Sequence, residues 1–278
     1  MTTSTTLPPP TDTAELDEAI GLLRDALAQG WASRELPAAG LRERLLQRVA
    51  VSAARHQGLV TVRRGHGAAI ELAPGVSARW LYRSADPTCL RPGEPLSLML
   101  LQLAPGVTLC TGLGLVGQGS EWLVMHGACT VDGVALAALD QHRRAASQGE
   151  PQLSSAPGAT VYLRNNGAAA MVPGTSRECD AVWDDFGPGI KRRLVWQQGG
   201  EGCYLARAEA GAFVPAHGHH IDEECLMLGG ELFLGDILLR EGEFQLAPAG
   251  MQHGIVQAAT ETLLYVRGDL MPAVDLVA

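Results

Sequence analysis

The sequence lacks the features that mark membrane-spanning, secreted and nucleic-acid-binding proteins. Its most apolar stretch, residues 96–107, is interrupted by Gln102 and Pro105 and is shorter than the ~18–20 residues that cross a bilayer. The opening residues MTTSTTLPPPTDT contain neither the basic nor the apolar region of a secretory signal. No extended run of Lys or Arg occurs, and 21 basic residues stand against 30 acidic ones, so a phosphate-neutralising surface has no obvious source. We expect a cytoplasmic protein that binds neither membranes nor nucleic acid directly.

Paired cysteines are also lacking. The six cysteines contain no C-x-x-C pair, and a chain of 278 residues is large enough to fold without disulfide staples. We therefore expect reduced and mostly buried thiols, at Cys89, Cys110, Cys129, Cys179, Cys203 and Cys225. At ~150 residues per domain, the length corresponds to about two domains.

The first sixty residues differ from the rest of the chain in composition and in hydrophobic pattern. Residues 1–12 are rich in Thr and Pro and predict a flexible tail. A capping-box sequence and leucines at helical spacing predict a helix over 12–30, which ends at a glycine. A second amphipathic pattern predicts a helix over 38–57. We treat 1–60 as a flexible tail followed by two amphipathic helices.

After residue 60 the pattern changes to short apolar runs separated by Gly, Pro and Asp. Runs such as LSLMLLQL at 96–103 and TLLYVRG at 262–268 predict many short strands. A long-period repeat is also present, because LAPGVSARWLYR at 72–83 aligns with FGPGIKRRLVWQ at 186–197. We infer two copies of one β unit of ~100 residues, in 61–170 and 171–278. The segment 135–148 looks like an insertion in the first copy, either helical or looped.

The second copy carries four residues suited to metal binding. Within 211–230 the order is Gly, five residues, His217, one residue, His219, three residues, Glu223, six residues and Gly. Within 242–253 it is Gly, five residues, Pro-x-Gly, two residues and His253. Alternate residues of a strand share a face, so His217 and His219 can point toward one ion. Three imidazoles and one carboxylate suit Zn, Fe(II), Mn, Ni or Cu. The alternative is that these are ordinary polar residues of a β unit.

The first copy does not repeat this set. Alignment of Glu121 with Glu224 places Gly114, Val116 and Ser120 at the first three ligand positions, and the fourth falls near Thr160 or in a deletion. None of these can replace imidazoles. We expect a degenerate unit without metal.

Both spacings match the two motifs of the cupin family, which implies an all-β fold of tandem double-stranded β-helix (jelly-roll) barrels after a short helical segment. Across 38–278 the chain more specifically resembles the ChrR family of anti-sigma factors and ChrR-like cupins. The resemblance is carried by LRERLLQRV at 41–49, LAPGV at 72–76, the Glu223–Glu224 pair and the PAG-x-x-H turn. It implies a regulatory or sensory role, one divalent metal held by His217, His219, Glu223 and His253, and a homodimer. Zn is the expected metal, with Fe, Mn or Ni as alternatives.

The same resemblance suggests a sigma factor as a partner of the N-terminal helices. The H-x3-C-x2-C zinc motif of the family's anti-sigma domain is absent here, since residues 1–60 contain no cysteine and only His56. The helices are therefore either a metal-free remnant that binds a sigma factor or a clasp across the barrels or between subunits.

The competing interpretation is an enzyme. Cupins of the quercetin and acetylacetone dioxygenase type use three histidines, with or without a glutamate, on a redox metal. In such an enzyme Glu223 could detach and act as a general base, and Cys225 could shape the pocket. In a sensor Cys225 could be an oxidation target, and otherwise it is a buried small residue. The residues near the motif are mainly apolar and favour a small apolar or aromatic ligand, namely Phe213, Val214, Leu226, Leu228, Phe244 and Leu246.

Overall fold

The computed structural model of the chain describes residues 38–55, 58–83, 97–109, 113, 118–167 and 171–270. The chain divides into two compact units, residues 1–57 and 58–278. The helix expected over 12–30 lies outside the described residues.

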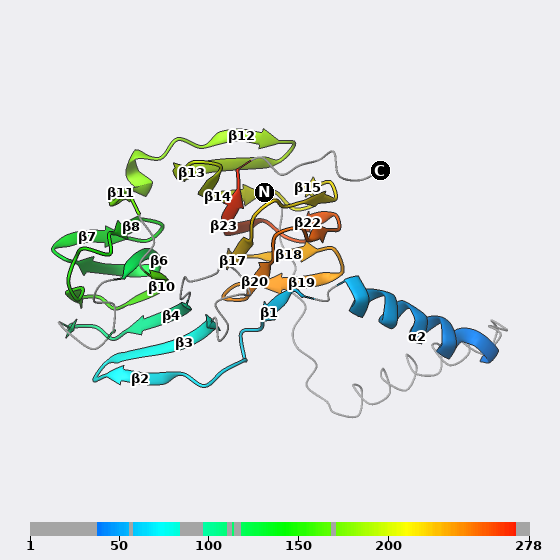
Figure 1. Cartoon of the computed structure of the whole chain (residues 1–278), viewed down its shortest axis with the longest axis horizontal. Helices are drawn as coiled ribbons and strands as arrows, with labels where there is room; N and C mark the ends of the chain where they lie inside the picture. The colour runs from blue at the N-terminus through cyan, green and yellow to red at the C-terminus, as the bar shows by residue number, and fades with distance from the viewer. Residues whose placement is uncertain are drawn as a thin grey trace, which may run out of the picture. The chain divides into compact units, whose positions relative to one another are not determined.

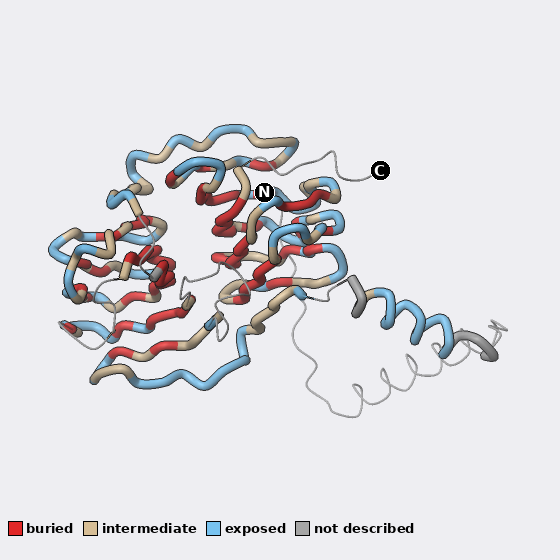
Figure 2. The backbone as a smooth tube through the Cα atoms, in the orientation of Figure 1, coloured by how far each residue is buried: buried red, intermediate tan, exposed pale blue. Residues whose placement is uncertain are grey.

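The helix expected over 38–57 is present. It is α2 (Ala38–Arg55), and in Figure 2 its described part is mostly pale blue, the colour of exposed residues. Its large apolar side chains Leu45, Leu46 and Val49 are 51%, 54% and 64% exposed. In the part of the chain that the structure describes, no helix is long and apolar enough to cross a membrane.

The second unit is built from antiparallel strands, as the runs of short apolar segments predict (Figure 1). We call one group of strands the first barrel. Its members are β2 (Ile70–Ala73), β3 (Val76–Arg83), β4 (Ser97–Leu103), β5 (Val107–Leu109), β6 (Gly119–Val131), β7 (Val134–Ala137), β8 (Gln141–Arg144), β9 (Leu153–Ser155), β10 (Ala159–Gly167) and β11 (Gly174–Ser176). The main path of this sheet runs β11-β8-β6-β10-β4-β3-β2.

The remaining strands form the second barrel. A seven-stranded sheet runs β1-β20-β17-β23-β14-β13-β12, a four-stranded sheet runs β15-β22-β18-β19, and β16 pairs with β21. These strands are β1 (Val60–Val62), β12 (Asp184–Gly187), β13 (Ile190–Gln198), β14 (Glu201–Ala208), β15 (Phe213–Val214), β16 (His217–Gly218), β17 (Glu223–Gly229), β18 (Glu231–Leu234), β19 (Ile237–Arg240), β20 (Phe244–Ala247), β21 (Gln252–His253), β22 (Val256–Ala258) and β23 (Thr262–Asp269). The short 3-10 helix η1 (Glu178–Asp180) precedes β12.

The strand register supports the internal repeat in detail. A β-bulge lies between Trp80 and Tyr82 where β3 pairs with β4, and another lies between Leu194 and Trp196 where β13 pairs with β14. These are equivalent positions in the alignment of 72–83 with 186–197. The two barrels therefore repeat one chain path down to its irregularities.

Each of the two sequence copies begins with a strand that joins the barrel formed by the other copy. β1 pairs with β20 of the second barrel, and β11 pairs with β8 of the first. In Figure 1 the cyan β1 lies beside the orange β20. Arg63, just after β1, contacts Glu243 at 3.0 Å, and Arg177, just after β11, contacts Asp140 at 3.4 Å. This exchange ties the halves together, and a boundary at residue 170 stays a prediction.

The expectation for residues 135–148 is wrong. The segment contributes β7 and β8, which pair with β6. These strands occupy the places of β19 and β20 in the second barrel, so the first copy has no insertion here. In the same register, the residue of the first copy that is equivalent to His253 is Glu150 and not Thr160. Thr160 lies in β10, which is the counterpart of β23.

Three apolar cores hold the second unit. One core fills the first barrel, and one lies within the second barrel. The third lies between the two barrels. The shared core combines side chains from both barrels, including Leu98, Leu123, Tyr162, Leu205, Leu226, Phe244 and Tyr265. Figure 2 shows the buried residues in red along the strands of both groups.

Gly230 illustrates how tightly the strands approach. Its φ is +76°, and a Cβ placed there would meet the carbonyl oxygen of Glu261 at 2.1 Å. Gly242 has the same φ of +76° with nothing within 4 Å of such a Cβ. We expect Gly242→Ala to cost about 1–2 kcal/mol, the penalty of a left-handed residue with a Cβ. Gly230→Ala should cost about 2 kcal/mol or more beyond that, because backbone must move. Urea unfolding of both variants measures the difference, and equal losses would contradict the close approach.

Candidate metal centre

The four residues expected to bind metal come together in the second barrel. His217 of β16 and His253 of β21 are direct partners across the strand pair, His219 follows β16, and Glu223 begins β17. One ligand atom from each of His217, His219 and Glu223 lies within 4.8 Å of the others. The ring centroids of His217 and His219 are 4.9 Å apart, as are those of His219 and His253. Nε2 of His253 is 3.1 Å from Oε1 of Glu223.

Two glycine-containing turns deliver these side chains. The four glycines of the two sequence motifs all have positive φ, between +76° and +86° at Gly211, Gly230, Gly242 and Gly250. The amide of Gly250 donates to the carbonyl of His219 at 2.8 Å, and the amide of His219 donates to the carbonyl of Met251. The left-handed turn at Gly250 thus fixes the loop that carries His219 against the loop that leads to His253.

The imidazoles have few protein partners. Nδ1 of His217 lies 2.8 Å from the carbonyl of Pro215, so it is the donor and Nε2 is left with its lone pair. Both ring nitrogens of His219 and Nε2 of His253 are buried and make no well-directed hydrogen bond among the described residues. Their nearest polar neighbour is the carboxylate of Glu223, which lies 3.4 Å from Nδ1 of His219 and 3.1 Å from Nε2 of His253. Buried polar atoms without partners are costly. A cation bound among these nitrogens and the Glu223 carboxylate would remove that cost, so the residues present fit a transition metal.

The electrostatics match this donor set. Burial lowers the pKa of His219 below its ordinary value, because the charged imidazolium is poorly solvated. Burial would raise the pKa of Glu223, but His253, His219 and His217 outweigh it and lower the pKa. His219 therefore offers a neutral imidazole and Glu223 an ionised carboxylate, the forms that bind metals.

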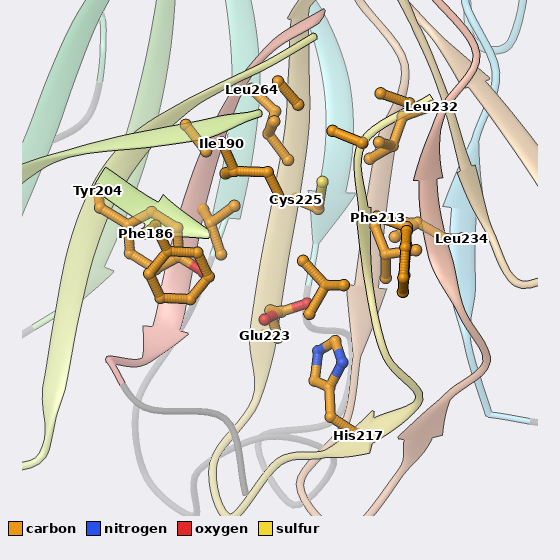
Figure 3. Close-up of a pocket in the computed structure, with 17 residues that line it drawn as sticks. Phe186, Ile190, Tyr204, Phe213, His217, Glu223, Cys225, Leu232, Leu234 and Leu264 are labelled. Carbon is orange, nitrogen blue, oxygen red and sulfur yellow. The ribbon is translucent and has the colours of Figure 1, made fainter. Parts of the chain in front are cut away.

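A cavity of about 70 Å³ adjoins these residues inside the second barrel (Figure 3). Figure 3 shows His217 and Glu223 side by side at one end of it and Leu232 and Leu264 toward the other. The lining has no Lys or Arg among the described residues, and its polar members are Tyr204, His217, Glu223 and Cys225.

The repeat explains why the second barrel is hollow. In equivalent strand registers, Leu101, Leu103 and Trp122 of the first barrel are replaced by Ala206, Ala208 and Cys225. The three larger side chains are buried in the core of the first barrel, whereas the three smaller ones line the cavity of the second. The first barrel is filled at the place where the second has space.

Cys225 faces inward, as one interpretation of the sequence has it. The side chain lines the cavity and is 3% exposed, and burial raises the pKa of its thiol. Thiolates are the reactive form, so this geometry favours a buried small residue over an oxidation target.

The apolar residues near the motif divide into two groups. Phe213 and Val214 line the cavity, while Leu226, Leu228, Phe244 and Leu246 belong to the core between the barrels. Tyr204 and the two alanines of β14, Ala206 and Ala208, were not predicted to line the cavity, because they precede the first motif and belong to neither motif. The alternation along each strand could have separated the groups, because Leu226 and Leu228 face away from Glu223 and Cys225.

The other described histidines lie apart from this cluster. His66 and His126 are exposed, and His142 is buried with Nδ1 2.8 Å from Oγ1 of Thr175. Ser120, at the Glu223 position of the first barrel, is buried and accepts a hydrogen bond from Trp122. Gly114, Val116 and His56 lie outside the described residues.

Metal content tests the ligand assignment. We expect His219→Ala to lose the bound metal, because it removes a buried nitrogen donor from the centre of the cluster. His220→Ala is the matched control, since His220 is the next residue but is exposed and pairs with Asp269. Elemental analysis of protein purified without added metal or chelator measures both. Metal retained at the wild-type level in His219→Ala would exclude this ligand set.

Comparison with known proteins agrees with the fold. Residues 175–271 match the family model of the ChrR cupin-like domain. No curated protein matched the chain in sequence. A proposed dioxygenase from Nostoc punctiforme superposes with a TM-score of 0.58 at 12% identity, covering 76% of this chain and 83% of that one. A proposed glyoxylate-induced protein from Pseudomonas aeruginosa gives 0.60 at 10% identity, covering 76% and 89%.

A single-site variant of Bacillus subtilis oxalate decarboxylase gives a TM-score of 0.59 at 14% identity, covering 77% of this chain and 78% of that one. Another structure of that decarboxylase, with a TM-score of 0.56, is described for its Mn(II) centres. At these identities the solved structures establish the fold alone. The chain has the fold of two tandem cupin barrels, and residues 175–271 of the second barrel are similar to the ChrR cupin-like domain.

Proposed function

We propose that this protein is a metal-binding regulatory cupin of the ChrR-like kind, in which the second barrel holds one divalent transition metal and the N-terminal helices bind a sigma factor. The observation that carries the proposal is the buried cluster of three histidines and one glutamate beside a small apolar cavity. We further propose a cytoplasmic location and a homodimer, on the resemblance alone.

Four protein ligands support a structural or sensory metal. A tetrahedral Zn²⁺ bound by all four residues would have no open position for a substrate. His217, His219, Glu223 and His253 would hold the ion, and the metal would supply stability to the turns that carry them. Zn is therefore our first choice, with Fe, Mn and Ni as alternatives.

The surface of α2 supports a protein partner. Leu45, Leu46 and Val49 lie on one side of the helix and are all more than half exposed. Exposed apolar residues at helical spacing are the usual anchors when a helix docks into a groove of a partner protein.

Co-purification with the sigma factors of the source organism tests the regulatory role. We expect specific capture by the full chain, and loss of at least ~10-fold in the double variant Leu45→Gln, Val49→Gln, because two apolar anchors are removed. Gln47→Ala is the control, since Gln47 is exposed on the opposite side of α2. Absence of capture at micromolar wild-type protein would contradict this role.

A second candidate is a metal-dependent dioxygenase. The specific observation in its favour is the cavity, which is bordered by His217 and Glu223 and enlarged by Ala206, Ala208 and Cys225. A redox metal with a fifth or sixth position could face this space. The lining suits a small apolar or aromatic substrate, and without a cationic side chain among the described residues it is poorly suited to a dianion such as oxalate.

Oxygen uptake distinguishes this candidate. If the protein is a dioxygenase, the Fe-, Mn- or Ni-loaded form will consume oxygen with a small diketone or aromatic substrate. Ala206→Leu places in the second barrel the side chain that the first barrel has at the equivalent position, Leu101. We expect this variant to lose turnover and keep its metal content, because the larger side chain fills the cavity and replaces none of the ligands. No uptake with any of these metals would count against the enzyme.

A further inference from the structure

The first barrel contains a buried arginine that contacts the metal-bearing strand of the second. Arg164 of β10 is 6% exposed, and its Nε and Nη2 donate to the carboxylate of Glu224 at 2.8–3.0 Å. Tyr162, also of β10, donates from its hydroxyl to the same carboxylate at 3.1 Å. Glu224 is 1% exposed. Every side-chain hydrogen bond that the described structure gives Glu224 therefore comes from the first barrel.

Glu224 is the residue directly after Glu223. Successive side chains of a strand point to opposite faces, so β17 presents Glu223 to the cavity and Glu224 to the first barrel. One carboxylate thus belongs to the candidate metal cluster, and the next is bound by Arg164 and Tyr162. A single rigid peptide joins the two residues.

The strand has little room to shift at this point. A Cβ on Gly268 of β23 would lie 3.3 Å from the Cα of Glu223, so β23 packs closely against the ligand's backbone. On the other side, Glu223 and Glu224 are in register with Ala247 and Leu246 of β20. The contact with Arg164 and Tyr162 adds a polar restraint from the first barrel to the packing of β17 in the apolar cores.

We infer that Arg164 is a positioning residue for the metal site, and that the degenerate first barrel serves the second by fixing β17 through the Arg164–Glu224 ion pair. This inference rests on the proposed metal site. A bidentate guanidinium–carboxylate pair fixes orientation as well as distance. Contacts to the residues and backbone around a metal ligand set how precisely that ligand is held.

The electrostatics of the cluster favour the ionised form of Glu224 beside Arg164. Burial alone would raise the pKa of Glu224, but Arg164 and Arg267 hold it below its ordinary value. Arg267 contributes at a longer distance, 3.8 Å from Nη1 to Oε1 of Glu224, and makes its shortest ion pair with Glu201. Arg164 is thus the principal cation facing Glu224.

The repeat supplies a matched control. Glu121 is the equivalent of Glu224 in the first barrel and is equally buried at 1% exposure. It lies 3.3 Å from Nε of Arg267 and 3.8 Å from Nη1 of Arg164, the latter beyond hydrogen-bond distance. Its neighbour at the ligand position is Ser120 rather than a glutamate. Glu121→Gln therefore removes the same kind of buried charge from β6, which carries none of the proposed metal ligands. The hydrogen bonds between Arg164 and Glu224 stay in place in this variant.

The test is Co²⁺ titration of the full chain, followed by the absorption of the bound ion, with thermal unfolding of each metal-free variant to confirm folding. We expect Glu224→Gln and Arg164→Lys to weaken Co²⁺ binding by about 10-fold or more and to alter its spectrum, while Glu121→Gln binds Co²⁺ as the wild type does. Arg164→Lys keeps the charge and decides the matter if Glu224→Gln does not fold.

The outcomes separate the two levels of the proposal. Wild-type affinity and spectrum in Arg164→Lys and Glu224→Gln would overturn the positioning role and leave the metal site intact. An equal loss in Glu121→Gln would overturn it too, because the effect would then follow general loss of packing. A wild-type protein that binds no Co²⁺ would overturn both the metal site and this inference.

Discussion

The buried ion pairs between the two barrels are the constraint on which the rest of the structure depends. Arg164 of the first barrel binds Glu224 of the second, and Arg267 of the second contacts Glu121 of the first. Each of these residues is at most 6% exposed. Leaving one such charge without its partner costs about 3–5 kcal/mol, so neither barrel can separate without a large penalty. The exchanged strands β1 and β11 and the shared apolar core act in the same direction.

On this common framework the two barrels differ in what fills them. Leu101, Leu103 and Trp122 close the first barrel, and the smaller residues at the same registers open the second. The binding capacity of the molecule is thereby concentrated on one side of a nearly symmetric frame. The filled first barrel has a close-packed core and little freedom to deform. It is therefore a rigid support for the strands of the second barrel that pack against it.

Much of this was predictable where the signal is local. Fixed spacings within strands and turns predicted that His217, His219, Glu223 and His253 come together. The repeat gave the correct equivalence of β3 with β13 and of Glu121 with Glu224, but not that of the strands that follow β6. The alanine-rich segment 135–148 was misjudged because propensity favoured a helix or loop, whereas pairing with β6 overrode it. The exchange of β1 and β11 and the partners of Glu224 depend on contacts between distant segments, for which the sequence carries no local pattern. The hollow of the second barrel appears only once strand registers are known.

Glu223 connects the metal cluster, the cavity and the frame. His219 and His253 do not line the cavity, so the residues through which an occupant of that space meets the cluster are His217 and Glu223. If the bound ion is four-coordinate, an open catalytic position would require Glu223 to leave the ion toward that space. The strand that carries Glu223 is restrained by Arg164 on one face and by the close approach of Gly268 at its backbone. A carboxylate held in this way keeps its position, which favours a closed site with a fixed ligand set and hence the regulatory proposal over the enzymatic one.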